Sequence, residues 1–273
     1  MPPKSKLGQN FLRDQQAIRR IVAALGDCSG RTVIEIGPGR GAITQELARA
    51  AGRLIALEVD QELAAQLSAD VLRPEFAEVA NITVETVDVL AFDFEAASKS
   101  AGQRLVVAGN LPYYITSPIL MRLADSAHVL DRAVLMIQLE VAERVTAKPG
   151  SRAYGLLSVV VQMHGHVEPL FTLPPSAFSP PPEVYSSVVR WRFAPRFEEL
   201  GIDRDRFLHF LRTVFALKRK TLANNLRASG IETGTIGSLL ETAIIDPKAR
   251  AEELPAETLA ALYRSLQGEG LFR

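Results

Sequence analysis

Cysteine is nearly absent from the sequence, and this limits the chemistry that the protein can hold. The single cysteine, Cys28, excludes an internal disulfide and a cysteine-rich metal site. The four histidines show no ligand spacing beyond His164-x-His166, and we expect no metal. No apolar run is long enough to span a bilayer, and the first ten residues lack the apolar core of a signal peptide. We therefore expect a cytoplasmic protein, bound to no membrane, with a monomer as the default state.

The chain also lacks net charge, with 31 Lys and Arg against 31 Asp and Glu, which is unusual for a protein that binds nucleic acid. The charges are unevenly distributed. Residues 1–20 hold five basic residues and one acidic residue, and residues 190–227 hold ten basic and four acidic residues. Two basic segments on an acidic body could bind phosphates, although surface charges also cluster by chance.

Short apolar runs alternate with helical segments along the first half of the chain. We expect strands at 32–36, 53–58, 81–87, 104–108 and 133–138, a loop at 26–30, and helices at 42–51 and, capped by Asp60, up to residue 69. This alternation predicts a doubly wound, mostly parallel α/β sheet. Two further strands are expected at 159–170 and 184–193, on either side of a proline-rich segment that can be neither helix nor central strand.

Only helical segments follow this region. They are expected at 203–217, 218–228, 234–243 and 255–267, after a linker at 195–201. The sequence thus predicts two domains, an α/β domain over residues 1–195 and a small helical domain over residues 196–273.

Ligands of an open parallel sheet bind beyond the carboxyl ends of its strands. The first expected strand leads into a loop in which Gly37 and Gly39 let the backbone approach a ligand before a helix begins. The second ends at Glu58, whose carboxylate can accept hydrogen bonds from ribose hydroxyls. Asp88 follows the third and could accept a hydrogen bond from an adenine amino group. These residues predict a nucleotide-like cofactor.

The glycine loop alone does not identify that cofactor. Its spacing is G-x-G-x-G rather than G-x-G-x-x-G, which leaves nicotinamide, flavin and S-adenosylmethionine open. The acid after the third strand favours S-adenosylmethionine, although an isolated Glu58 or Asp88 could equally be a solvated turn carboxylate.

Asn110-Leu-Pro-Tyr113 follows the fourth strand and predicts the chemistry. An exocyclic adenine amine is a poor nucleophile because its lone pair is delocalised into the ring. The side-chain oxygen of Asn110 and the carbonyl of Leu111 can each accept one amine N–H, which favours a pyramidal nitrogen aimed at a sulfonium methyl. Pro112 fixes the turn, and Tyr113 offers a face on which an extruded base stacks, worth about 1–3 kcal/mol. Elsewhere in a chain, such a tetrapeptide is usually only a turn.

Eight segments carry a resemblance to a known family. The chain resembles the ribosomal RNA adenine dimethylases nearly end to end, at residues 7–12, 35–41, 58, 88–90, 110–113, 138–144, 175–184 and 215–226. The resemblance implies a seven-stranded, doubly wound, Rossmann-like methyltransferase sheet with a small all-helical C-terminal domain that binds RNA. Tyr114, where many relatives have Asn, and Val87, where Gly is frequent, depart from the family pattern.

The resemblance also implies roles for individual residues. Contacts to S-adenosylmethionine, whose product is S-adenosylhomocysteine, are implied for Asn10, Leu12, Gly37, Glu58, Asp88 and Asn110. Phe178 would close the base pocket opposite Tyr113. The implied product is dimethyladenosine at two adjacent adenines near the 3′ end of small-subunit (16S) ribosomal RNA, which makes the small ribosomal subunit the partner. Six basic residues would contact RNA phosphates: Arg190, Arg192, Arg212, Lys218, Arg219 and Lys220.

Three other functions stay open at this point. A large-subunit RNA methylase of the macrolide-resistance type tends toward Asn-Ile-Pro in the motif. A DNA adenine methyltransferase usually carries Asp-Pro-Pro-Tyr or Asn-Pro-Pro-Tyr. A non-catalytic ribosome-assembly factor would not need the intact motif and Glu58.

Overall fold

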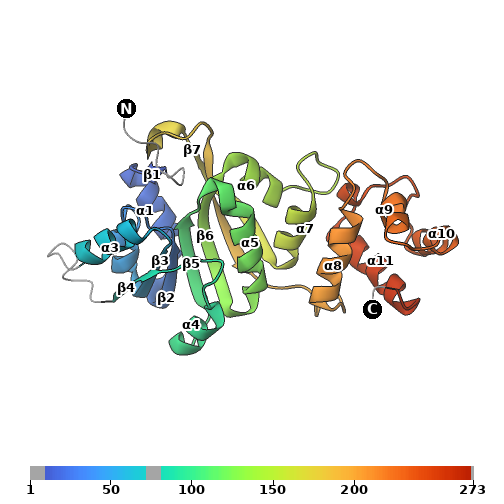
Figure 1. Ribbon diagram of the computed structural model, residues 1–273, viewed down its shortest axis with the longest axis horizontal. Helices are drawn as coiled ribbons and strands as arrows, with labels where there is room; N and C mark the ends of the chain where they lie inside the picture. Colours follow the sequence, from blue (N-terminus) through green and yellow to red (C-terminus); the bar gives the residue numbers. More distant parts are fainter. Residues whose placement is uncertain (1–9, 72–80, 272–273) are drawn as a thin grey trace. The chain divides into compact units, whose positions relative to one another are not determined.

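The computed structural model describes residues 10–71 and 81–271, which form two compact units (Figure 1). The first unit comprises the described residues up to Ala142 together with His166–Phe193. The second comprises Glu143–Gly165 together with the described residues from Ala194 onward. The predicted division into residues 1–195 and 196–273 lies close to the observed boundary after Phe193. It differs in residues 143–165, which pack with the second unit rather than the first.

The first unit is built on a seven-stranded sheet, which confirms the predicted fold class. The strand order is β4-β3-β2-β5-β6-β9-β7. Each pair among the first five strands is parallel, and β9 pairs antiparallel with β6. The bounds are β2 Cys28–Ile36, β3 Ala51–Glu58, β4 Ile82–Thr86, β5 Leu105–Asn110, β6 Leu130–Gln138, β7 Gly165–Leu173 and β9 Ser186–Phe193. The carboxyl ends of β2 to β5 therefore meet along one edge, where the candidate residues were expected.

Helices flank this sheet (Figure 1). Central strand residues such as Ile34, Val106 and Val107 are fully buried, because both faces of the sheet are covered. The Asp60 side chain caps α3 as predicted, accepting hydrogen bonds from two backbone N–H groups of its first turn. The helices are α1 Gln15–Ala24, α2 Thr44–Ala50, α3 Gln61–Asp70, α4 Phe94–Ala101, α5 Thr116–Asp125 and α6 Leu139–Val145.

A small second sheet ties the N-terminal segment to the proline-rich segment. Its strands, β1 Phe11–Leu12 and β8 Phe178–Ser179, pair antiparallel with Leu12 opposite Phe178. This pairing joins parts of the chain that lie more than 160 residues apart in the sequence, which no periodicity could predict.

The second unit is helical, as expected for the C-terminal region. Its helices are α7 Leu156–Met163, α8 Arg204–Val214, α9 Leu222–Ala228, α10 Thr233–Thr242 and α11 Ala256–Gly268. Phe207, Phe210 and Tyr263 form its aromatic core, with ring centroids 5.4 to 5.8 Å apart. Within the described residues, no helix has the length and apolarity needed to cross a membrane.

The expected strand at residues 159–170 is wrong in its first half. Residues 156–163 form α7, and the strand β7 begins only at Gly165. Val159, Val160 and Val161 are all buried, and a short run of consecutive apolar residues fits a buried helix as well as a buried strand.

Two element boundaries also differ from the prediction. The expected loop at 26–30 is partly strand, because Cys28 pairs with Ala51 at the start of β2. The expected helix at 218–228 begins only at Leu222, because the Thr221 side chain caps it by accepting the N–H of Asn224. Residues 218–220 therefore lie in a loop.

Gly109 sets the spacing between β2 and β5 and yields a stability prediction. A Cβ on Gly109 would lie 2.6 Å from the carbonyl oxygen of Ile36, so Gly109→Ala must push the strands apart. We expect it to lower the free energy of unfolding by about 1–3 kcal/mol in chemical denaturation. The control is Gly30→Ala in β2, whose added Cβ would meet nothing within 4 Å. Equal stability of the two variants would contradict the prediction.

Candidate active site

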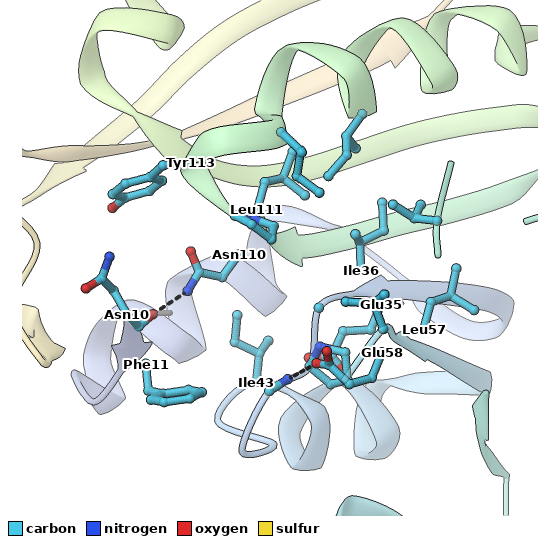
Figure 2. A pocket seen from close by; sticks show the side chains of 18 of the residues that line it. Asn10, Phe11, Glu35, Ile36, Ile43, Leu57, Glu58, Asn110, Leu111 and Tyr113 are labelled. Carbon is cyan, nitrogen blue, oxygen red and sulfur yellow. Dashed lines mark hydrogen bonds between the residues drawn. The ribbon is translucent and has the colours of Figure 1, made fainter. Parts of the chain in front are cut away.

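A pocket opens at the carboxyl ends of β2, β3 and β5 (Figure 2). It encloses about 950 Å³ of empty space, open solvent at its mouth included. The structure brings all seven predicted cofactor residues to its wall: Asn10, Leu12, Gly37, Gly39, Glu58, Asp88 and Asn110. The other motif residues, Leu111, Pro112 and Tyr113, line the same pocket.

The glycine loop after β2 adopts a backbone that only glycine tolerates well. Gly37, Gly39 and Gly41 have φ angles of 65°, 56° and 77°. The N–H of Gly37 donates to the carbonyl of Leu57 at 3.0 Å, which ties the loop to the end of β3. A Cβ on Gly37 would lie 3.6 Å from the carbonyl oxygen of Asn110, so the loop and the Asn-Leu-Pro-Tyr motif are adjacent.

Glu58 braces the glycine loop from the end of β3. Its side chain is buried, Oε2 accepts the N–H of Gly39 and Oε1 accepts the N–H of Asp60, both at 3.0 Å (Figure 2 shows the first of these). Each carboxylate oxygen retains a second lone pair, so the predicted contact to ribose hydroxyls is compatible with this bracing. The bracing role itself was not predicted.

Glu35 lies in the same pocket and is 2% exposed. Burial, opposed by the Thr44 hydroxyl and aided by the neighbouring charge of Glu58, raises the pKa of its carboxyl to about 8. Among the described residues, no group donates a hydrogen bond to its Oε2. Two buried carboxyls on one pocket wall favour a ligand that carries positive charge.

Asn110 ends β5, and its side-chain amide is held in one orientation. Nδ2 donates to the backbone carbonyl of Asn10 at 2.9 Å. Oδ1 is therefore the atom that can accept a hydrogen bond from a substrate amine. The backbone N–H of Leu111 donates to the carbonyl of Met136 at 3.0 Å, which fixes the motif against β6. Figure 2 shows the Asn110 side chain beside those of Asn10 and Tyr113.

Tyr113 is half-buried, and its hydroxyl lies 2.5 Å from the Oγ of Ser186 at the start of β9. Burial raises the pKa of the Tyr113 hydroxyl, an effect that the contact with Ser186 opposes. The next residue, Tyr114, is 59% exposed at the rim of the pocket.

The N-terminal segment closes one side of the pocket. Asn10 lies beside the motif, and Leu12 is buried opposite Phe178 in the small sheet. The Phe11 ring covers the glycine loop so closely that a Cβ on Gly39 would lie 2.9 Å from the ring. The Arg40 guanidinium lies 4.6 Å from the centre of that ring.

Of two further predicted site residues, Asp88 lines the pocket and Phe178 does not. Phe178 is 4% exposed and packs in the hydrophobic core with Leu12 and Ala177, and it is not among the residues that line the pocket. Its stacking role stays a prediction. Asp88 does line the pocket, with its carboxylate accepting the N–H of Leu90 at 2.9 Å.

The six predicted RNA-binding residues divide between the two units. Arg190 and Arg192 point from one face of β9 to the carboxylate of Glu168, at 2.7 and 3.1 Å, which offsets part of their charge. The other four are exposed in the second unit: Arg212 in the last turn of α8, and Lys218, Arg219 and Lys220 in the loop before α9. Among the described residues, no cluster of three or more His, Cys, Asp or Glu could hold a metal ion.

A family comparison agrees with this site. The model of the ribosomal RNA adenine dimethylases matches residues 3–268. The chain belongs to this family. It is 54% identical to the ribosomal RNA small subunit methyltransferase A of Acidobacterium capsulatum, over 97% of this chain and 91% of that one. The enzyme of the same name from Koribacter versatilis is 44% identical, over 97% and 94%. The predicted family resemblance and methyltransferase class are confirmed.

Solved structures share the fold of this adenine dimethylase. A dimethyladenosine transferase from Plasmodium falciparum superposes with a TM-score of 0.80, at 23% identity, over 96% of this chain and 98% of that one. The 23S rRNA methyltransferase ErmE superposes with a TM-score of 0.71, at 24% identity, over 94% and 100%. At these identities the likeness concerns the fold.

Three residues that contribute to the site of this adenine dimethylase were not predicted from its sequence. Phe11 covers Gly39, and its only sequence signal is its place in an N-terminal segment shared with the family. Glu35 belongs to the segment that contains the glycine loop, and no separate role was predicted for it. Ser186 gives no sequence signal, because its contact with Tyr113 spans 73 residues.

Glu35 yields a pH prediction. Between its ordinary pKa of 4.5 and about 8, the folded protein holds a proton on Glu35 that the unfolded chain has lost. Wild-type stability therefore falls as pH rises through this window, by at most about 1.4 kcal/mol per pH unit. In Glu35→Gln this contribution is absent, so the stability of the variant relative to wild type should increase from pH 5 to pH 8 in chemical denaturation.

The matched control for this experiment is Glu241→Gln, at an exposed position in α10. Its stability should follow that of wild type across the same pH range. Parallel curves for wild type and Glu35→Gln would show that Glu35 does not titrate in this window.

Proposed function

We propose that this protein transfers methyl groups from S-adenosylmethionine to the 6-amino groups of two adjacent adenosines near the 3′ end of small-subunit (16S) ribosomal RNA. The small ribosomal subunit is then its partner, ribosome biogenesis its pathway and the cytoplasm its place of action. One observation carries the proposal. The amide nitrogen of Asn110 donates to the Asn10 carbonyl, so the amide oxygen can accept a hydrogen bond from a substrate amine, and this amide lies beside the glycine loop.

The pocket residues fit S-adenosylmethionine. Glu58 would accept hydrogen bonds from the ribose hydroxyls, Asp88 would accept one from the adenine amine, and residues 10–12 with Gly37 would hold the methionine end. The buried carboxyls of Glu35 and Glu58 suit a cofactor that carries positive charge. When bound, S-adenosylmethionine supplies an electrophilic methyl group, and S-adenosylhomocysteine is left.

The motif residues then prepare the adenine amine. The Oδ1 of Asn110 and the carbonyl of Leu111 accept its two N–H groups, which localises the nitrogen lone pair and directs it away from the acceptors. Pro112 shapes the turn, and Tyr113 stacks on the extruded base. The N-methylated amine loses its extra proton to water, so no strong base is needed.

The alternatives are less well supported. The names of the two most similar relatives reported above refer to the small ribosomal subunit, which favours it over the large subunit. The motif reads Asn-Leu-Pro-Tyr rather than the Asn-Pro-Pro-Tyr usual in DNA adenine methyltransferases. The ordered Asn110 amide and the braced glycine loop would serve no purpose in a purely non-catalytic assembly factor.

A methylation assay tests this proposal. Labelled S-adenosylmethionine is incubated with unmethylated small subunits, naked ribosomal RNA or DNA, and the modified bases are mapped. We expect label at two adjacent adenines of the small subunit, and no label with Asn110→Ala or Tyr113→Ala at unchanged folding. Label elsewhere in RNA or in DNA, or turnover by Asn110→Ala, would overturn the proposal.

The exposed basic loop at residues 218–220 is the best candidate for phosphate contacts, because no carboxylate within the described residues pairs with it. The buried Asn225 side chain holds this loop by accepting the N–H of Leu217 at 2.8 Å. Three cations on an ordered loop can neutralise up to three phosphates.

Replacing Lys218, Arg219 and Lys220 together by alanine should therefore weaken RNA binding and reduce the slope of log K against log salt by about 2–3. Lys248→Ala, exposed in the same unit, is the control and should lower the slope by at most about 1. The measurement is a filter-binding titration at several salt concentrations. An unchanged slope in the triple variant would show that the loop does not contact phosphate.

A further inference from the structure

Ser186 contacts Tyr113 from a segment outside the Asn-Leu-Pro-Tyr motif. It is the first residue of β9, it is fully buried, and its Oγ lies 2.5 Å from the hydroxyl of Tyr113. Hydroxyl–hydroxyl hydrogen bonds have this length or slightly more. The contact therefore joins the far end of the Tyr113 ring to the central sheet.

Backbone hydrogen bonds hold Ser186 in place. Ser186 pairs with Gln138 in the antiparallel ladder between β9 and β6, and the carbonyl of its neighbour Tyr185 accepts the N–H of Leu139 at 2.9 Å. The β6 strand also receives the N–H of Leu111 at the carbonyl of Met136. The Tyr113 hydroxyl is thus held by β9, and the motif that carries Tyr113 is held by β6, the strand paired with β9.

The orientation of the ring matters for the proposed reaction. A tyrosine ring turns about two side-chain bonds. Stacking requires the ring to lie where an extruded base can meet its face. The hydroxyl oxygen lies on the axis of the χ2 rotation, so a hydrogen bond there restrains χ1 and fixes the direction in which the ring projects from the motif.

We infer that Ser186 is a positioning residue, whose hydroxyl holds the Tyr113 ring in the place where an extruded adenine stacks on it. This inference rests on the proposed adenine methylation. Ser186 is not among the residues that line the pocket, so it acts on the placement of the base and not on the binding of the cofactor. Tyr113 supplies the stacking face, and Ser186 fixes its position.

A double-mutant cycle tests this inference. Tyr113→Phe keeps the ring and removes its hydroxyl, and Ser186→Ala removes the other partner. We expect each single variant to lower kcat for small-subunit methylation about 10- to 100-fold, because small displacements of a reacting group are costly. The double variant should be no slower than the slower single variant, while the dissociation constant for S-adenosylmethionine stays within about twofold of wild type.

Ser187→Ala is the matched control. Ser187 is also buried and follows Ser186 in β9, but it points to the opposite face of the sheet, and we expect wild-type kcat. A second readout uses RNA with 2-aminopurine at the target adenine, whose fluorescence reports stacking of the extruded base. Ser186→Ala and Tyr113→Phe should change this signal alike, and Ser187→Ala should leave it as in wild type.

Two results would overturn the inference. One is wild-type kcat and fluorescence in Ser186→Ala. The other is a double variant in which the two losses multiply, since Ser186 would then act through something other than the Tyr113 hydroxyl. Failure of the underlying function looks different, because wild-type protein itself would then leave small-subunit adenines unmethylated.

Discussion

The close approach of β2 and β5 is the constraint on which the site depends. Parallel pairing of Ile36 with Gly109 brings the carboxyl ends of the two strands to the same level, and the absence of a side chain at Gly109 lets the backbones meet. The glycine loop leaves one strand and the Asn-Leu-Pro-Tyr motif leaves the other. The glycine loop and the motif are therefore held at a fixed separation by the backbone hydrogen bonds between the two strands.

Buried acids give this edge of the sheet its electrostatic character. Glu58 is stabilised as a carboxylate by two backbone N–H donors, whereas Glu35 has an unpartnered oxygen and a pKa raised to about 8 by its burial. The two carboxyls thus play different parts. Glu58 braces the loop, and Glu35 is costly to ionise because it is buried. A protein does not keep such a group for stability, which fits a binding role.

The sequence predicted those parts of the fold and site that depend on local pattern. Strand ends carry Glu58, Asp88 and Asn110, and each reached the pocket, because parallel strands share an edge and the motif lies in short segments. Long-range contacts could not be predicted in this way. Phe178 is buried in the pairing of β1 with β8 and does not line the pocket. The apolar run at 159–161 was predicted as strand but lies in α7, at whose start the N–H of Gly155 donates to the Ser158 hydroxyl.

Those long-range contacts explain why a short motif alone does not make an active site. The Asn110 amide donates to Asn10, which precedes the parallel strands in the sequence, and the Tyr113 hydroxyl contacts Ser186, which follows them. The parallel strands determine where the motif lies. The contacts of its Asn110 and Tyr113 side chains come from segments before and after those strands in the sequence. An Asn-x-Pro-Tyr turn elsewhere lacks both partners, and its amide and ring remain free to rotate. The chemistry therefore belongs to the whole first unit rather than to the tetrapeptide.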